Sequence, residues 1–306
     1  MVIAVETEER TNDAPLRSVS GHDVRRFLRR PGAWNVIGGG SVIALIALVA
    51  VFAPLIAPYS PTQQSLTMTL LPPAWAEGGS PAHLLGTDAL GRDMLTRLIY
   101  GTQVSLLVGL ATAAGAAVIG VALGVVSGYF GGRVDNLIQR VVEVFQAFPF
   151  VLLAILLVAV SGGGTWKIVL VLILSRWPNF CRVARAEAMS ARTREYVLAA
   201  HSMGAGGVRV MFRHILPTVV APTIVLMTFA ISAAILGEAS LSFIGIGVDP
   251  QTATWGIMLS DGRNYMYANP WIMVPPGVAL FLVVMSTNIM GDGLRDLTDP
   301  RMRNRR

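Results

Sequence analysis

The sequence has little charge and few reactive side chains, and these shortages exclude several classes of protein. Charged residues make up 14% of the 306 residues, whereas soluble globular proteins average about 25%. The only lysine, Lys167, lies outside any G-x-x-x-x-G-K-[ST] sequence, so the chain has no P-loop site for ATP hydrolysis. The only cysteine, Cys181, excludes an intrachain disulfide and a cysteine-rich metal site.

Sequence patterns for catalysis are missing as well. None of the four histidines stands in an H-E-x-x-H sequence, and no serine stands in G-x-S-x-G. The net charge of +6 is spread between apolar runs and forms no basic domain of the kind that binds nucleic acid. We therefore expect a protein that is not an enzyme, that binds no cofactor or metal of its own, and that has no nucleic-acid partner.

Long apolar runs are abundant and define the fold class. A helix needs about 20 mostly apolar residues to cross a bilayer, and backbone polar groups in lipid must be paired within the helix. The runs lack the alternation of a membrane barrel, so we expect an all-α integral membrane protein with six transmembrane helices. The fourth run is short and is interrupted by Arg176 and Pro178. The six runs are Val36–Ala53, Val104–Val126, Leu137–Val160, Ile168–Phe180, Val219–Gly237 and Trp271–Met290.

The arginines predict the orientation, because cytoplasmic loops carry an excess of arginine and lysine. With six spans and a cytoplasmic N-terminus, most arginines lie inside, and both termini are cytoplasmic. The basic residues that then lie outside are Arg92, Arg97, Lys167 and Arg263. The first run follows "RRFLRRP" but has no small-residue cleavage site after it, so we interpret it as a retained helix and not as a signal peptide.

These spans divide the chain into segments. Residues 58–101 form the largest external loop, in which we expect a short surface helix capped by Thr87 and ended by Gly101. The expected order is a cytoplasmic N-terminal segment 1–33, a first helix 34–57, the external loop 58–101, a five-helix core 102–294 that contains a cytoplasmic loop at about 190–217, and a cytoplasmic tail 295–306.

The second and third spans carry further signals. Gly120, Gly124 and Gly128 form a ridge of small residues that allows close helix contact, and we favour contact within the chain over contact with a partner. Pro149 predicts a kink in the third span. Two carboxylates are expected at membrane depth, Glu143 and Glu238, where ionisable groups are costly and often functional. We expect structural or gating roles for them, because a proton relay usually has several such groups.

The segment 195–217, "EYVLAAHSMGAGGVRVMFRHILP", is too polar to be a span and too apolar to be a plain linker. It predicts two short helices joined by a glycine-rich turn, which we call the elbow (residues 195–217). Arg209 and Arg213 share one face of the second helix, and Pro217 marks the start of the fifth span. The other face is apolar, with residues at i, i+3, i+4 and i+7: Val208, Met211, Phe212 and Ile215. By pattern alone, this is also what an amphipathic elbow on a membrane surface would look like.

The elbow resembles the cytoplasmic loop of ATP-binding-cassette (ABC) importer permeases. The pattern of that loop is E-A-A, then three residues, G, nine residues and I-x-L-P. The matching residues are Ala199, Ala200, Gly204, Leu216 and Pro217, whereas Leu198 replaces the glutamate and His214 an aliphatic residue. "LGTDALGRDMLTRLIYGTQVSLLVG", "LGEASLSFIGIG" and "NIMGDGLRDLTDP" resemble signatures of the dipeptide/oligopeptide/nickel permease family, C-type subunit. The resemblance covers nearly the whole chain, and "LPPAWAEGGSPAHLLGTD" is most similar to the dipeptide branch.

The resemblance implies a type I ABC importer permease in a bacterial inner membrane, surrounded by membrane lipid. Its implied partners are a B-type permease, two ABC ATPase subunits that bind ATP and Mg²⁺, and an extracytoplasmic substrate-binding protein. It also implies that the elbow docks on an ATPase subunit. The implied coupling residues are Glu195, Tyr196, Ala199, Ala200, Gly204, Ala205, Arg209, Leu216 and Pro217.

Other functions stay open at this point. Within the same family, the solute would alternatively be nickel, glutathione or another small peptide-like molecule. A secondary transporter is disfavoured, because the chain shows no symmetric pair of broken helices with ionisable groups at the midplane. A membrane enzyme is disfavoured by the missing nucleophile and metal patterns.

Overall fold

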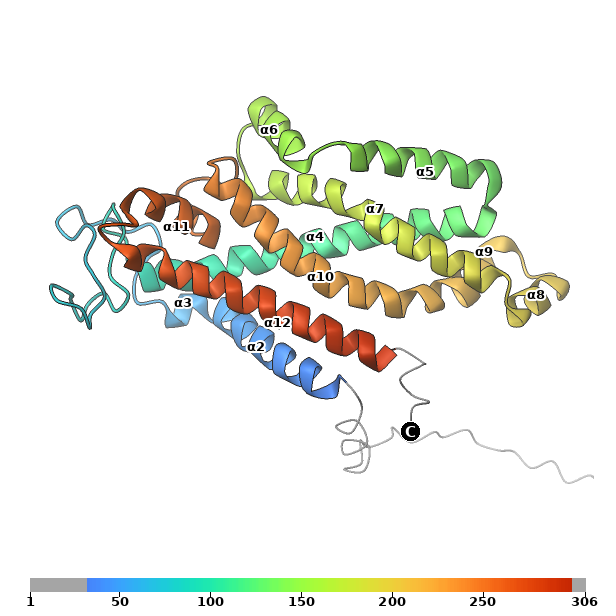
Figure 1. Cartoon of the computed structure of the whole chain (residues 1–306), viewed down its shortest axis with the longest axis horizontal. Helices are drawn as coiled ribbons and strands as arrows, with labels where there is room; N and C mark the ends of the chain where they lie inside the picture. Colours follow the sequence, from blue (N-terminus) through green and yellow to red (C-terminus); the bar gives the residue numbers. More distant parts are fainter. Residues whose placement is uncertain (1–31, 299–306) are drawn as a thin grey trace, which may run out of the picture.

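The long apolar runs are helices that extend lengthwise through the molecule in the computed structural model, which describes residues 32–298 (Figure 1). The expected all-helical class is confirmed for this part of the chain, where the β-structure amounts to an isolated bridge between Thr87 and Asp93. The long helices are α2 (Ala33–Val51), α4 (Met94–Phe130), α7 (Thr165–Arg192), α10 (Leu216–Phe243) and α12 (Val274–Thr298). The shorter elements are α3 (Ala53–Ile56), α5 (Gly132–Ala147), α6 (Phe150–Ser161), α8 (Glu195–Ser202), α9 (Gly207–Val210), the π-helical turn η1 (Met211–Ile215), α11 (Trp255–Gly262), η2 (Arg263–Tyr265) and η3 (Pro270–Ile272).

Four helical stretches of residues 32–298 are long and apolar enough to cross a membrane. They are Ala33–Val51, Met94–Phe130, Gly207–Phe243 and Pro270–Thr298. The pair α5 and α6 is a fifth stretch if it is counted as one broken span. Helix α7 is long enough but less apolar, because Lys167, Arg176 and Arg182 interrupt its first 18 residues.

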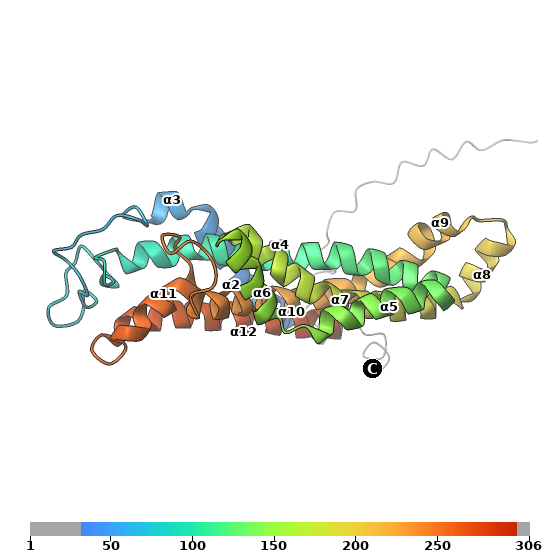
Figure 2. The same cartoon turned by 90° about the horizontal axis from the view of Figure 1, so that it is seen from above.

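The two ends of the molecule differ in structure. The loop from Ala57 to Asp93 and helix α11 lie at one end, and α8 and α9 lie at the other (Figures 1 and 2). Helix α2 begins and helix α12 ends away from the loop, toward the end that carries α8 and α9. The predicted N-terminal segment and most of the predicted tail lie outside the described residues.

The glycine ridge of α4 packs on α7, so the expectation of contact within the chain is confirmed. A Cβ atom added to Gly120 would lie 2.5 Å from the carbonyl oxygen of Trp177, and one on Gly124 would lie 2.5 Å from that of Cys181. A Cβ atom on Gly128 would lie 2.6 Å from the carbonyl oxygen of Arg185. Backbones approach this closely only where side chains are absent, and α7 is thereby fixed along the length of α4.

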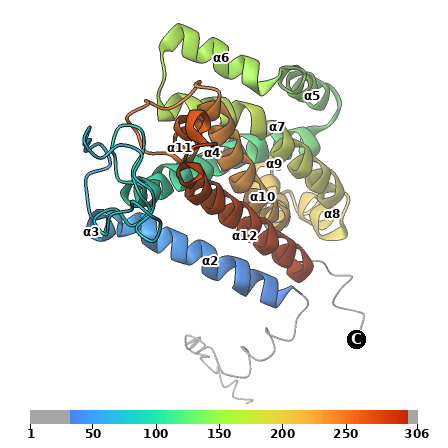
Figure 3. The ribbon, with the colours of Figure 1, turned by 60° about the vertical axis from the view of Figure 1, so that its left-hand side comes forward.

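Helices α2 and α12 form a second close pair, side by side in Figure 3. Gly39 of α2 faces the backbone of Ser286 and Met290, and Gly293 of α12 faces the backbone at Gly32 and Val36. The start of the first helix therefore lies beside the end of the last one.

The predicted surface helix in the external loop is wrong. Helix α4 starts at Met94 and runs through Gly101, which is buried against Trp255, to Phe130. Asp93 caps it, accepting a hydrogen bond from the Thr96 amide at 2.7 Å, whereas the Thr87 hydroxyl donates to the Met68 carbonyl at 2.5 Å. Residues 94–101, expected in a separate surface helix, are the first part of α4, so the boundary expected at 101 falls inside one helix.

The predicted third span is broken where a kink was expected. Helices α5 and α6 meet at an angle of 80° around Phe148 and Pro149. Pro149 has extended backbone angles and precedes the first residue of α6, because proline cannot continue a helix through its own missing N–H. Helix α5 has 16 residues and α6 has 12, so each is shorter than a full crossing.

Candidate functional site

The first arm of the elbow is helix α8, which ends in a glycine turn. Gly204 has a φ of +81°, a conformation that costs other L-residues roughly 1–2 kcal/mol. The Ala205 amide donates to the Ala200 carbonyl and the Gly204 amide to the His201 carbonyl. This pair of bonds is the Schellman arrangement, which satisfies the last carbonyls of a helix. The predicted glycine turn after the first helix of the elbow is therefore present, at Gly204.

The second arm of the elbow is continuous with the fifth apolar helix, which differs from the predicted separate helix. Helix α9 leads without a break into η1 and α10, and the Leu216 amide bonds to the Met211 carbonyl across the wider turn. Pro217 follows at the start of α10. A π-turn accommodates a proline because the helix is already locally widened, and such turns are frequent at functional sites.

One side of the elbow is anchored on its own bundle. Val197, Val210 and Ile215 are fully buried with alanines of α7 and Val125 of α4. The Tyr129 hydroxyl lies 3.3 Å from His201 Nε2, and the Tyr129 carbonyl accepts a hydrogen bond from Arg192 Nη1 at 2.9 Å. The elbow is therefore a fixed projection of the bundle.

The other side of the elbow faces outward. Met203 is 82% exposed, and Val208, Phe212, Leu198 and Tyr196 are also exposed. The predicted apolar stripe is split, since Met211 and Ile215 are buried while Val208 and Phe212 are open. Exposed apolar side chains gathered in this way are typical of a surface that contacts another protein or a membrane.

The predicted coupling residues fall into two groups, those that pack against the chain itself and those that lie on its outer surface. Ala200 is 4% exposed, so it packs inside the chain and is not a surface for close approach by a partner. Ala205 and Leu216 are half-buried against the cluster that anchors the elbow. The predicted residues on the outer surface are Glu195, Tyr196, Ala199, Gly204, Arg209 and Pro217.

An ion pair that the sequence analysis missed fixes the base of the elbow. Arg185 of α7 donates to both carboxylate oxygens of Asp135, at 2.5 Å and 2.6 Å, and Ser127 donates to one of them at 2.5 Å. These residues lie on three different helices, α7, α5 and α4. A bidentate arginine pair holds a defined geometry, so the three helix ends are tied at the end that carries the elbow.

The two carboxylates predicted at membrane depth have different surroundings. Glu143 lies on the polar helix α5 and is exposed, 3.3 Å from Arg140. Glu238 is fully buried in α10, and its Oε1 accepts a hydrogen bond from Ser242 at 2.8 Å. Its other oxygen has no hydrogen-bond partner among the described residues. The roles of both residues, and of Pro149, stay predictions.

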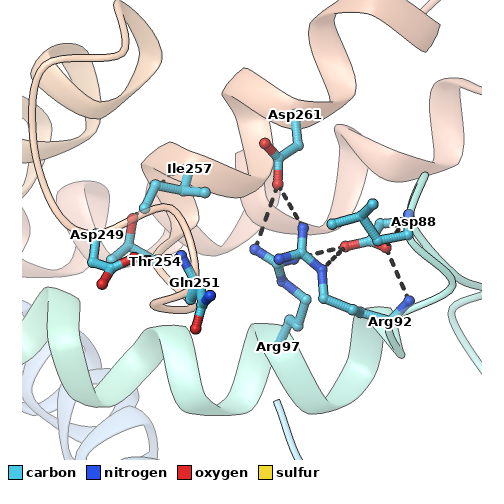
Figure 4. A network of polar contacts seen from close by, with 9 residues as sticks. Asp88, Arg92, Arg97, Asp249, Gln251, Thr254, Ile257 and Asp261 are labelled. Atoms are coloured by element: carbon cyan, nitrogen blue, oxygen red, sulfur yellow. Dashed lines mark hydrogen bonds and ion pairs between the residues drawn. The ribbon is translucent and has the colours of Figure 1, made fainter. Parts of the chain in front are cut away.

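The opposite end of the molecule contains a cluster that we call the external clamp: Asp88, Arg92, Arg97 and Asp261 (Figure 4). Both arginines and Asp88 are buried. Asp88 Oδ2 accepts from Arg92 Nε at 2.6 Å and from Arg97 Nη1 at 2.7 Å, and Arg92 Nη2 reaches Asp261 at 2.9 Å. The clamp joins the start of α4 to α11 across 169 residues of sequence.

Local geometry supports the clamp. Asp88 Oδ1 accepts hydrogen bonds from the amides of Leu90 and Arg92, which closes the turn before α4. Burial raises the pKa of the Asp261 carboxyl, and the positive charge of Arg92 opposes that rise. Three residues of the clamp, Asp88, Arg92 and Arg97, lie close together in the sequence "TDALGRDMLTR". The fourth, Asp261, is distant in the sequence and gives no local signal for the clamp.

The class of protein is shown by the families whose sequences it matches. Residues 120–304 match the family described as binding-protein-dependent transport system inner membrane component, and residues 21–73 match the N-terminal transmembrane domain of oligopeptide transport permease C. The chain belongs to this family of non-catalytic permease components, and it is a multi-pass inner-membrane protein.

Relatives of known name extend over most of the chain. It is 44% identical over 261 residues to the dipeptide transport system permease protein DppC of Haemophilus influenzae, covering 85% of this chain and 88% of that one. It is 42% identical over 278 residues to the di/tripeptide transport system permease protein DppC of Pseudomonas aeruginosa, covering 91% of each. A solved structure titled as inward facing conformations of the MetNI methionine ABC transporter has the same fold, with a TM-score of 0.56, 19% identity, and coverage of 67% of this chain and 98% of that one.

Proposed function

We propose that this chain is the C-type permease subunit of an ATP-driven importer for dipeptides or short oligopeptides. The observation that carries the proposal is identity of 42–44% over most of the chain to permeases named for dipeptide and di/tripeptide transport. With a B-type permease it forms the path across the membrane. Two ATPase subunits bind ATP and Mg²⁺, and a substrate-binding protein delivers the peptide from outside.

The elbow is the contact with an ATPase subunit. Support comes from its fixed base, its exposed tip and its position at one end of the bundle (Figures 1 and 2). Because α8 packs on α7, and η1 leads directly into α10, displacement of the tip moves two long helices together. ATP-driven closure of the ATPase pair would thereby shift the path from inward-open to outward-open, since the elbow makes different contacts in the two states.

The chain crosses the membrane six times with both termini in the cytoplasm. Helix α7 is one of the six, because it packs along α4 through the glycine ridge. The broken pair α5 and α6 is another. Support for this arrangement comes from the start of α2 and the end of α12, which both lie away from the external loop (Figure 1).

Reconstitution tests the proposal directly. The chain is co-expressed with the permease, ATPases and binding protein from neighbouring reading frames, and the purified complex is placed in liposomes with ATP trapped inside. Labelled dialanine and binding protein are added outside. We expect uptake that requires ATP and binding protein, whereas uptake driven by a proton gradient without ATP, or uptake of nickel and no peptide, would overturn the proposal.

A further inference from the structure

Arg176 lies near the middle of α7. A charged side chain in the middle of a membrane helix is costly and is usually functional. Trp166, at the outer end of this helix, is 65% exposed and typical of a membrane interface. Ten residues of helix from Trp166 to Arg176 span about 15 Å, which is half of a hydrocarbon core of about 30 Å. With α7 as one of the six proposed spans, this spacing places Arg176 near the bilayer midplane.

The guanidinium of Arg176 is loosely held. Its Nη2 lies 3.4 Å from the Ala233 carbonyl of α10, its Nε is buried without a hydrogen-bond partner, and no carboxylate lies within ion-pair distance of it among the described residues. By contrast, Arg92, Arg97 and Arg185 each bind a carboxylate at 2.5–2.7 Å. These three arginines therefore have a carboxylate partner among the described residues, and Arg176 does not.

The surroundings of Arg176 are polar without adding charge. Asn179, one turn along the helix, is exposed and accepts a hydrogen bond from Gln146 of α5 at 3.4 Å. Pro178 removes a backbone N–H from the same turn of α7. Charged and polar side chains at the midplane are costly against lipid and usually face a water-filled path or a protein partner. This part of α7 therefore suits a position against the path or against the partner permease, and not against lipid.

We propose that Arg176 binds the C-terminal carboxylate of the peptide as it crosses the membrane, an inference that rests on the proposed function. The planar guanidinium matches a carboxylate with two parallel hydrogen bonds. Every dipeptide carries this carboxylate whatever its side chains, so the contact suits a path used by many sequences. A cation with no fixed anion can bind and release the peptide in each cycle.

The test compares Arg176→Gln, Arg176→Lys and the matched control Arg182→Gln, an exposed arginine of the same helix. Each is measured in the reconstituted complex for uptake of dialanine and dialanine amide, with stimulated ATP hydrolysis as a parallel readout. Both solutes are supplied at concentrations that saturate this stimulation, so that the binding protein does not select between them. We expect Arg176→Gln to lower dialanine uptake about tenfold, to keep stimulated ATP hydrolysis, and to remove the preference of the wild type for the free acid over the amide. Arg176→Lys should restore much of the uptake, and Arg182→Gln should resemble the wild type.

Four results would overturn this inference. They are an unchanged acid-to-amide preference in Arg176→Gln, an equal loss of uptake in Arg182→Gln, a parallel loss of ATP hydrolysis and uptake, and a failure of the two permeases to assemble. The last result would show that Arg176 pairs with a carboxylate of the partner permease. Absence of ATP-dependent peptide uptake in the wild type would instead refute the proposed function.

Discussion

Arg97 Nη1 and Asp88 Oδ2 lie 2.7 Å apart in an ion pair whose side chains are 1% and 3% exposed. Asp88 also binds Arg92, so one buried carboxylate serves two guanidinium groups. The first turn of α4 is therefore fixed by charges that have little access to water.

Asp88→Asn should destabilise the subunit by about 3–5 kcal/mol, because it leaves buried arginines short of a compensating charge. The measurement is thermal unfolding of the purified permease pair. The matched control is Arg140→Gln, which removes an exposed pair with Glu143 and should cost less than about 1 kcal/mol. Equal effects of the two variants would contradict a structural clamp.

Asp261→Asn should change how stability depends on pH. Burial raises the pKa of the Asp261 carboxyl, so the folded protein holds this proton more tightly than the unfolded chain does. The contribution of this group is therefore greatest below its unfolded pKa and is lost as pH rises through the raised, folded value. Unfolding curves are measured from about pH 4 to pH 7. The wild type should lose part of its free energy of unfolding over this range, and the variant should not. Identical pH profiles would show that the raised pKa of Asp261 does not contribute to stability.

Gly204→Ala should reduce coupling between ATP hydrolysis and transport, because alanine strains the left-handed backbone that ends α8. Gly206→Ala is the matched control, since Gly206 lies two residues away with a φ of −65°. Neither added Cβ would touch another part of the chain. Gly204→Arg should have a larger effect, because its side chain would project into the proposed ATPase cleft. The measurement is ATP hydrolysis stimulated by loaded binding protein, at normal subunit levels.

A second test of the elbow uses cross-linking. Ala199→Cys, on the exposed side of α8, should form a disulfide with a cysteine placed in the docking cleft of the ATPase, in a yield that ATP changes. Full stimulation in Gly204→Arg, together with no cross-link at any cleft position, would leave the elbow as a helix on the membrane surface.

Cysteine labelling should confirm the topology. The natural Cys181 is buried, so it contributes little background. Glu77→Cys lies on an exposed part of the external loop and should react in intact cells with a reagent that does not cross membranes, whereas Gly206→Cys should react only after permeabilisation. Labelling of Gly206→Cys in intact cells would be incompatible with a cytoplasmic elbow.

The local features of this protein follow from sequence, because they depend on neighbouring residues. Apolar runs of about 20 residues form helices in lipid whatever packs beside them. The glycine spacing on α4 predicted a close helix contact, and Gly204 predicted a turn that other residues resist. The break at Pro149 follows from the chemistry of one residue.

Only the tertiary structure decided which groups meet across long separations. Asp261 completes the clamp from 169 residues beyond Arg92, and Arg185 reaches Asp135 from another helix. Packing also decided that Ala200 is buried while Ala199 is exposed. Hydrophobic periodicity gives the face of a helix, but the partner that covers that face depends on the path of the whole chain, and a single sequence contains no local signal for it.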